Sequence, residues 1–253
     1  MRVLDLFSGI GGFSLGLESV GMETVAFCEM DAFCQKVLKK HWPNVPIHSD
    51  IKELDGHEYR GAVELICGGF PCQPFSVAGE QRGAEDDRAL WPEMFRIIKE
   101  SKPKWVIGEN VSGFTKMALQ DVSLDLEREG YAVWAFLLPA CAVDALHRRD
   151  RCYFVANQED VAHSLRERSQ GGLHRRSDEE RKGELGHTRC SGPTYRQSRQ
   201  KIWLPEPPVG RVANGVPDRT HRLKSLGNAV VPPLVAEIGR IVMYHQENGL
   251  DPR

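Results

Sequence analysis

Residues 2–12 read RVLDLFSGIGG, and this stretch decides the fold class of the chain. An apolar run leads directly into a turn that contains three glycines, and a helical pattern of apolar residues then continues to Gly21. Strand, glycine-rich turn and helix in this order form the opening unit of nucleotide-binding α/β domains. We therefore expect an α/β fold with a Rossmann-like, doubly wound and mostly parallel sheet.

The second expected strand, residues 24–28, is followed by Glu29. An acidic side chain at this position is well placed to accept hydrogen bonds from both hydroxyls of a ribose. The dinucleotide fingerprint G-x-G-x-x-G is not met, because the sixth position counted from Gly9 is Ser14. Glu29 therefore favours a nucleoside ligand, while Ser14 argues against a nicotinamide dehydrogenase.

A carboxylate stands beside an apolar side chain at Asp50 and Ile51. This pair suits an adenine, with Asp50 accepting from the exocyclic amine and Ile51 packing against the ring face. An aspartate that caps the next short helix explains Asp50 equally well. From the sequence, both interpretations stay open.

Residues 68–76, GGFPCQPFS, follow a short apolar run at 62–67 that we expect to be a buried strand. Two glycines allow a sharp turn, and the flanking prolines exclude a helix or a central strand around Cys72. The thiol is thus displayed on a stiff loop at the carboxyl end of a strand, where open α/β sheets bind ligands. Free cysteines are usually buried and inert, so this stretch alone supports a structural and a functional role equally.

Two further polar clusters lie at the ends of expected strands. Glu109 and Asn110 follow the strand at 105–108, and a buried carboxylate is costly unless it is used or fully paired, which favours a function. Arg149 and Arg151 alternate at the start of a strand that forms a hairpin with residues 131–139, so they share one face. That spacing suits a phosphate or a base oxygen, although a solubilising turn contains such residues too.

The totals describe a chain of 253 residues with 41% hydrophobic and 27% charged side chains, long enough for one sizeable core. Seven cysteines form an odd set without a dense framework, which indicates free thiols in a reducing, cytoplasmic setting. We expect no signal peptide before the first strand, and no apolar run approaches the ~20 residues that cross a bilayer. We also expect no membrane partner, and a monomer.

Charge is distributed unevenly along the chain. Residues 147–224 contain 17 Lys+Arg against 10 Asp+Glu, a balance of +7, whereas the remaining residues have a balance of −9. Only seven of the 45 residues at 157–201 are apolar, so we expect a largely irregular segment there. The basic part is either a surface for a partner or a solvated loop.

His174, His187 and Cys190 lack the paired spacing of zinc ligands, so we expect no metal.

Taken together and in this order, the motifs resemble those of the DNA (cytosine-5) methyltransferases. They are DLFSGIGG at 5–12, Glu29, Asp50-Ile51, GGFPCQPFS at 68–76, ENV at 109–111, Arg149-x-Arg151 and GNAVVP at 227–232. The resemblance covers residues 1–156 and about 217–246. It implies a class I S-adenosylmethionine-dependent methyltransferase fold, with a catalytic domain at 1–156 plus 217–253 and a short target-recognition region at 157–216.

The resemblance also assigns catalytic roles. Cys72 would add to carbon 6 of a cytosine flipped out of the duplex, which makes carbon 5 nucleophilic, and elimination of Cys72 would later release 5-methylcytosine. Glu109 would engage N3 and the exocyclic amine. Arg151 would hold O2, and Arg149 would support the site.

S-adenosyl-L-methionine is the implied cofactor and methyl donor. Its implied binding residues are Phe7, Ser8, Gly9, Gly11, Gly12, Glu29, Met30, Asp50, Ile51, Pro71, Asn228 and Val230. The implied partner is double-stranded DNA, in a restriction–modification or phage or prophage context, and a cognate restriction endonuclease would act on the same site.

Two features depart from the family pattern. The family usually has a proline and a glutamine before the arginine pair, where this chain has Leu146 and His147. The recognition region is also short and poor in apolar residues. We hypothesise that residues 157–216 order only on DNA, with binding dominated by the DNA backbone and a short or relaxed recognition sequence.

Three other functions share part of this pattern. A cytosine-5 methyltransferase that acts on tRNA uses the same motifs. A catalytically silent relative that binds only DNA or cofactor would have lost the cysteine or the glutamate, and here both Cys72 and Glu109 are present. A nicotinamide dehydrogenase is disfavoured by Ser14 and by the loop around Cys72.

Overall fold

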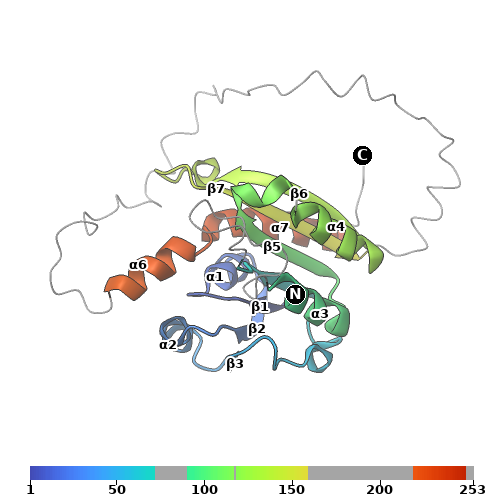
Figure 1. The fold of residues 1–253 in the computed structure, drawn as a ribbon, viewed down its shortest axis with the longest axis horizontal. Coiled ribbons are helices and arrows are strands. Elements are labelled where there is room, and N and C mark those ends of the chain that lie inside the picture. Colours follow the sequence, from blue (N-terminus) through green and yellow to red (C-terminus); the bar gives the residue numbers. More distant parts are fainter. Residues whose placement is uncertain (72–89, 117, 159–218, 249–253) are drawn as a thin grey trace, which may run out of the picture.

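A seven-stranded sheet in the order β3-β2-β1-β4-β5-β7-β6 forms the centre of the part of the chain that the structure describes (Figure 1). The structure is a computed structural model that describes residues 1–71, 90–116, 118–158 and 219–248. The strands are β1 (Arg2–Leu6), β2 (Glu23–Cys28), β3 (Ile47–His48), β4 (Leu65–Gly68), β5 (Trp105–Val111), β6 (Tyr131–Pro139) and β7 (Asp150–Gln158). Strands β1 to β5 pair in parallel, whereas β7 is antiparallel to both β5 and β6.

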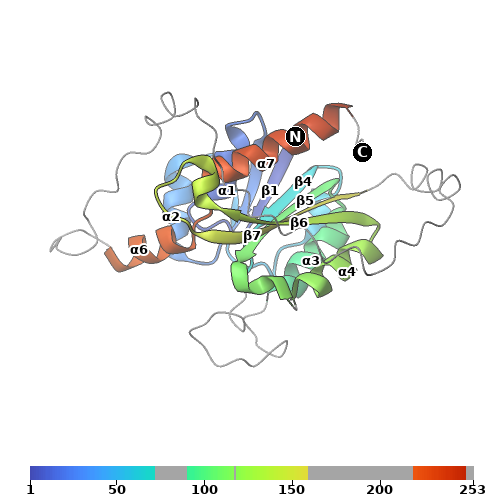
Figure 2. The same cartoon turned by 90° about the horizontal axis from the view of Figure 1, so that it is seen from above.

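Helices cover both faces of this sheet (Figure 2). One face carries α1 (Gly12–Glu18) and α7 (Pro232–Asn248), and the other carries α3 (Trp91–Ser101) and α4 (Ala118–Arg128). The remaining elements are α2 (Ala32–His41), α6 (Arg219–Asn228) and the 3-10 helices η1 (Gly56–Tyr59), η4 (Ser112–Lys116) and η5 (Ala140–Val143). The expected α/β fold with a doubly wound, mostly parallel sheet is confirmed.

Neighbouring residues of the central strands belong to two different cores. On β1, Val3 packs with α1 and α7, while Leu4 packs with α3 and α4, and both side chains are fully buried. The same division holds for Leu65 and Ile66 on β4. Successive side chains of a strand point to opposite faces, so a sheet covered on both sides needs continuous apolar runs. Burial on both faces of the sheet explains why successive strand residues are apolar, and not only every second one.

The topology fixes where a ligand can bind. From β1 the chain winds outward through β2 to β3, and then returns to place β4 on the other side of β1. Open α/β sheets bind ligands at such a switch point, outside the carboxyl ends of the strands. Residues that follow β1, β2, β4 and β5 therefore converge on one edge of the sheet.

The expected start of one strand was wrong. The strand expected at 62–67 begins only at Leu65, because the N–H groups of Ala62 and Val63 donate to the Tyr59 carbonyl and close a turn after η1. The domain boundary expected after residue 156 stays a prediction, and β7 runs two residues past it, to Gln158. Asn157 is buried and pairs with Trp105 of β5, so the sheet continues where an irregular segment was expected.

Residues Thr220–Asn248, which cover most of α6 and all of α7, contain an 18-residue window with a mean hydropathy of 1.3, so by length and composition they could cross a membrane. One side of α7 faces the protein, however, while Ile241 and Tyr244 on this helix are exposed. Leu234, Val235, Ile238 and Val242 are buried and belong to the core that includes α1 residues. We therefore interpret α7 as a core helix of the α/β domain.

Close packing of α1 against α7 yields the first prediction. A Cβ atom on Gly16 would lie 2.5 Å from the Pro232 carbonyl oxygen and 2.8 Å from the Val235 Cβ. Because backbone and a branched side chain cannot move aside cheaply, Gly16→Ala should lower the free energy of unfolding by about 1–3 kcal/mol. Urea unfolding of the purified protein measures this change. Gly227→Ala is the matched control, since among the residues that the structure describes no heavy atom lies within 4 Å of its Cβ position, so its free energy of unfolding should not fall.

Candidate functional site

A cavity of about 830 Å³ lies at the carboxyl ends of β1, β2, β4 and β5, at the switch point of the sheet. Its size is within the usual range for small-molecule and cofactor sites. Most of the residues that the sequence singled out line this cavity. They are Phe7, Ser8, Gly9, Gly12, Glu29, Met30, Asp50, Ile51, Pro71, Glu109, Arg151, Asn228 and Val230.

Three of the expected site residues are not in the cavity wall. Cys72 lies outside the described residues. Gly11 is the N-cap of α1 in the left-handed region, with φ +83°, and a Cβ there would lie 2.6 Å from the Trp42 ring, so it is needed for the turn itself. Arg149 donates from Nη2 to the carbonyl oxygens of Gly227 and Ala229, at 2.7 and 2.8 Å. Arg149 therefore fixes the segment that closes the cavity.

The turn after β1 is held in an unusual backbone conformation. Phe7 has φ +52°, which is costly for a side chain with a Cβ and is found mainly at functional sites. Ser8 Oγ donates to the Asp5 carbonyl at 2.6 Å, and Gly9 N–H donates to Glu29 Oε2 at 2.7 Å. No heavy atom of the described residues lies within 4 Å of the Cβ position of Gly9, so the described part of the chain leaves the backbone there open to a ligand.

Glu29 links two parts of the cavity wall. Its other oxygen, Oε1, accepts from Asp31 N–H at 2.7 Å, while Oε2 holds Gly9. Each carboxylate oxygen has a second lone pair, so Glu29 can still accept hydrogen bonds from ligand hydroxyls. Glu29 is thus both a structural clamp on the turn and an acceptor at the cavity.

Asp50 forms the capping interaction that the sequence allowed, while its contact with an adenine stays a prediction. Its Oδ1 accepts from Lys52 N–H at 2.9 Å, which is a capping interaction, and the residue also lines the cavity. Ile51 beside it is buried, and its carbonyl accepts from Arg96 Nη2 at 2.7 Å. Arg96 also pairs with Glu93 and Glu100, so α3 holds this part of the wall in place.

Glu109 at the end of β5 is 7% exposed, and its Oε1 lies 2.9 Å from Arg151 Nε on β7. Burial raises the carboxyl pKa to about 7, and the charges of Arg151 and Arg149 lower it only in part. Oε1 is buried against the Arg151 guanidinium and forms no well-aligned hydrogen bond within the described residues. Glu109 therefore exchanges a proton near neutral pH at the wall of the cavity.

The chain that leads to Cys72 passes close to Glu109. A Cβ on Gly69 would lie 3.3 Å from Glu109 Oε2, so glycine permits this approach. Phe70 is buried among aromatic rings, with centroids 5.3 Å from Trp91 and 5.5 Å from Phe114. The start of the loop is therefore anchored beside the buried carboxyl.

Asn110 in the cavity wall and Asp5 beneath the glycine turn make contacts that the sequence did not predict. Asn110 Nδ2 donates to the Phe70 carbonyl at 3.1 Å, which ties the start of the Cys72 loop to β5. Asp5 is fully buried under the glycine turn, and its Oδ2 accepts from Ser14 Oγ at 2.7 Å. Burial raises the Asp5 pKa to about 7. An acidic residue inside an otherwise apolar strand was the sequence signal that could have drawn attention to Asp5. Its hydrogen-bond partner is Ser14, the residue that breaks the dinucleotide fingerprint.

The expectation of no metal concerned His174, His187 and Cys190, which lie outside the described residues. Within the described ranges, Asp55, His57 and Glu100 place ligand-type atoms within 4.8 Å of one another. These carboxylates already accept hydrogen bonds from backbone N–H groups, at His57 and Gly56, and Glu100 also pairs with Arg96. We therefore assign no metal to this group.

Comparison with known proteins identifies the family. The model of the C-5 cytosine-specific DNA methylases matches residues 1–200. The chain belongs to this family. Type II methyltransferase M.HgiCII of Herpetosiphon aurantiacus is 34% identical over 165 residues, which are 63% of this chain and 38% of that protein. Type II methyltransferase M.HhaI of Haemophilus parahaemolyticus is 35% identical over 166 residues, 64% of this chain and 50% of that protein.

Solved structures agree with this family assignment. A crystal structure titled as a putative DNA modification methyltransferase encoded within a prophage of E. coli matches with a TM-score of 0.54 and 25% identity. The match covers 66% of this chain and 48% of that one. The chain thus spans half or less of the length of the curated relatives named above.

The environment of Glu109 yields the second prediction. Arg151→Gln should raise the Glu109 pKa further above about 7, because it removes the main charge that opposes burial. Carboxyl ¹³C NMR titration of protein with labelled glutamate measures this value, and Glu109→Gln assigns the signal. Since the folded pKa exceeds the ordinary value of 4.5, the stabilisation by the protonated group is complete below about pH 4.5 and is lost as pH rises towards 7.

The control for this titration is Arg128→Gln. Arg128 pairs with Asp125 on the exposed side of α4, away from Glu109. Its removal should leave the Glu109 titration unchanged. A Glu109 pKa that stays the same in Arg151→Gln would show that the ion pair does not set the protonation of this site.

Proposed function

We propose that the protein is a DNA (cytosine-5)-methyltransferase that methylates carbon 5 of a flipped-out cytosine with S-adenosyl-L-methionine. The main support is that two groups of residues with different chemistry line the same cavity. Glu29, Asp50 and Ile51 form one part, and Glu109 and Arg151 form another, with Pro71, which precedes Cys72, also in the wall. A methyl donor and a base bound in the same cavity would meet near the Cys72 loop.

The residues present fit S-adenosylmethionine. Carboxylates of Glu29 and Asp50 suit ribose hydroxyls and an exocyclic amine, and buried apolar side chains such as Ile51 and Phe13 suit an adenine face. The open backbone at Gly9 leaves room for close approach, since a side chain there would fill this space. Bound in this cavity, the cofactor would supply a methyl group on a positively charged sulfur.

The protein residues would activate the base. The Cys72 thiolate would form a bond to carbon 6 of the cytosine, and a proton from Glu109 to N3 would neutralise the charge that this addition places on the ring. A pKa near 7 allows Glu109 to be present as the acid under neutral conditions. Arg151, next to Glu109, would hold the base oxygen O2, while Arg149 positions the segment around Asn228.

The remaining assignments are part of the same proposal. Residues 1–156 plus 217–253 would form the catalytic domain, with the first part extended to Gln158 by β7, and the intervening segment would be the target-recognition region. The partner would be double-stranded DNA in a reducing cytoplasm, bound by a monomer. Relatives named as type II methyltransferases and as a prophage-encoded enzyme favour a restriction–modification or prophage context, with a cognate endonuclease.

Methyl transfer tests this proposal and is the third prediction. Purified protein with methyl-labelled S-adenosylmethionine should label duplex DNA and not tRNA, and nanopore sequencing of the product should report 5-methylcytosine at one short site. Cys72→Ser should reduce the rate of methyl transfer by about 10³-fold or more and should leave the affinity for S-adenosylmethionine unchanged. Cys141→Ser is the matched control, because Cys141 is an exposed free cysteine whose replacement should leave the rate unchanged.

The outcomes separate the alternatives. Label in tRNA would favour the RNA enzyme, and undiminished turnover by Cys72→Ser would exclude covalent addition by this thiol. Binding of cofactor and DNA without any transfer by the unaltered protein would indicate a silent relative.

Glu29 yields the fourth prediction. Glu29→Ala removes the acceptor for Gly9 and Asp31 together with that for a ribose, so S-adenosylmethionine should bind about tenfold or more weakly by calorimetry. Glu23→Ala, at the exposed start of the same strand, should keep the affinity of the unaltered protein. Equal affinities of the two variants would remove Glu29 from the cofactor site.

A further inference from the structure

Helix α6 displays basic side chains at the rim of the cavity. Its sequence, RTHRLKSLGN, contains no acidic residue, and His221, Arg222 and Lys224 are exposed. Lys224, Gly227 and Asn228 line the cavity. Few apolar side chains of α6 are buried, so packing alone does not explain this composition.

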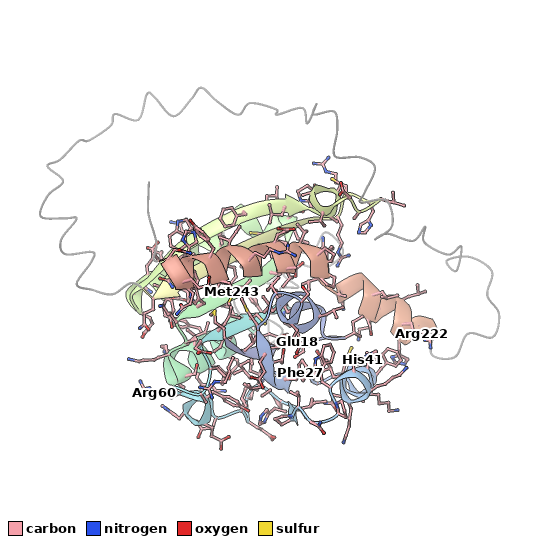
Figure 3. The ribbon with its side chains drawn as sticks, turned by 180° about the vertical axis from the view of Figure 1, so that it is seen from behind. Glu18, Phe27, His41, Arg60, Arg222 and Met243 are labelled. Carbon is pink, nitrogen blue, oxygen red and sulfur yellow. The ribbon has the colours of Figure 1, made fainter. Side chains whose placement is uncertain are left out.

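Three contacts hold α6 beside α2. The rings of Phe33 and His221 stack with centroids 5.7 Å apart, and Cys34 Sγ lies 3.4 Å from Ser225 Oγ. Lys224 Nζ lies 3.4 Å from Asp31 Oδ2. Figure 3 shows Arg222 on α6 and His41 on α2 at the same end of the molecule. The two helices therefore present one joint surface.

Helix α2 extends the positive charge of α6. Lys36 and Lys40 follow Phe33 by three and seven residues, so they lie on the side of α2 that faces α6, and both are exposed. Within the described residues, neither Lys36, Lys40 nor Arg222 forms an ion pair with an acidic side chain. We call Lys36, Lys40, His221, Arg222 and Lys224 the α2/α6 basic patch.

We propose that the α2/α6 basic patch binds the phosphate backbone of duplex DNA beside the target base. This inference rests on the proposed function, because it places the cytosine near Glu109 at the end of β5. Three strand spacings separate β5 from β2, which precedes α2, and at ~4.8 Å each they span roughly 14 Å. The patch would therefore contact phosphates that lie to one side of the flipped cytosine.

The positive charge of the α2/α6 basic patch suits the phosphates of duplex DNA. Unpaired lysine and arginine side chains neutralise phosphates and release counterions, which gives affinity without sequence preference. Lys224 borders the cavity and holds Asp31, so the patch joins the site without interruption. A surface of this kind supplies affinity that a recognition region poor in apolar residues cannot supply by packing.

The fifth prediction tests the patch by salt dependence. The triple variant Lys36→Glu/Lys40→Glu/Arg222→Glu should bind a labelled duplex of about 30 base pairs at least about tenfold more weakly at low salt. Its slope of log Kd against log salt should shrink by about 0.9 for each phosphate that the variant no longer neutralises. Fluorescence anisotropy between about 50 and 200 mM salt measures both values. The glutamine version of the triple variant should show a smaller change in the same direction.

The control is Arg60→Glu/Lys102→Glu/Lys104→Glu, which changes the charge equally. These exposed residues precede β4 and β5, at the edge of the sheet opposite the cavity, and Figure 3 shows Arg60 at the other end of the molecule from Arg222. Cofactor affinity by calorimetry confirms that all variants are folded. Ethylation interference on the methylated site should locate the phosphates that the unaltered protein binds and the patch variant leaves free.

The results distinguish the two proposals. If the unaltered protein methylates DNA but the patch and control variants show the same salt slope, the patch does not contact DNA and only this inference fails. If the unaltered protein transfers no methyl group to DNA, yet the patch variant alone binds the duplex more weakly, the patch is upheld and the proposed function fails. A patch effect seen with tRNA and not with duplex DNA would overturn the inference in favour of an RNA partner.

Discussion

The ion pair between Glu109 and Arg151 is the interaction on which the site depends. Antiparallel pairing of β5 with β7 brings the two residues together, since Val111 lies opposite Arg151 and Glu109 opposite Tyr153. A buried carboxylate without a cation would be strongly disfavoured, and a fully ionised pair would hold its proton poorly. Because the charges of Arg151 and Arg149 offset only part of the effect of burial, the pKa of the Glu109 carboxyl is about 7. This balance allows the same side chain to give and to recover a proton at neutral pH.

Other segments are arranged around that pair by polar contacts between distant parts of the chain. Asn110 holds the start of the Cys72 loop through the Phe70 carbonyl, and Arg149 holds the Gly227–Ala229 backbone. Glu29 holds the glycine turn after β1. Each contact uses a side chain at the end of one element to fix the backbone of another. The cavity is therefore built from rigid strand ends and short clamps, which is how α/β sheets position ligands.

Local patterns predicted the fold class and several residues of the cavity wall, while the resemblance to the methyltransferases supplied the rest of the expected site residues. Apolar runs and glycine turns determine where strands end, and parallel strands bring their ends together, so Glu29, Asp50 and Glu109 were found from position alone. The function of Asn110 and Arg149 as clamps could not be predicted, since each depends on a backbone carbonyl that is 40 to 80 residues away. The boundary at Gln158 was missed because Asn157 is polar, and only its pairing with Trp105 keeps it in the sheet.

Packing of α1 against α7 has a consequence for synthesis of the chain. Residues at the two ends of the sequence form one core, so the face of the sheet that contains Val3, Leu65 and Ile107 is only partly covered, by α1, until α7 has left the ribosome. Contacts of such long sequence separation form late, and an uncovered apolar sheet face associates readily with other chains. A nascent or truncated chain that lacks α7 would therefore need a chaperone, although Glu109 and Arg151 would already be present.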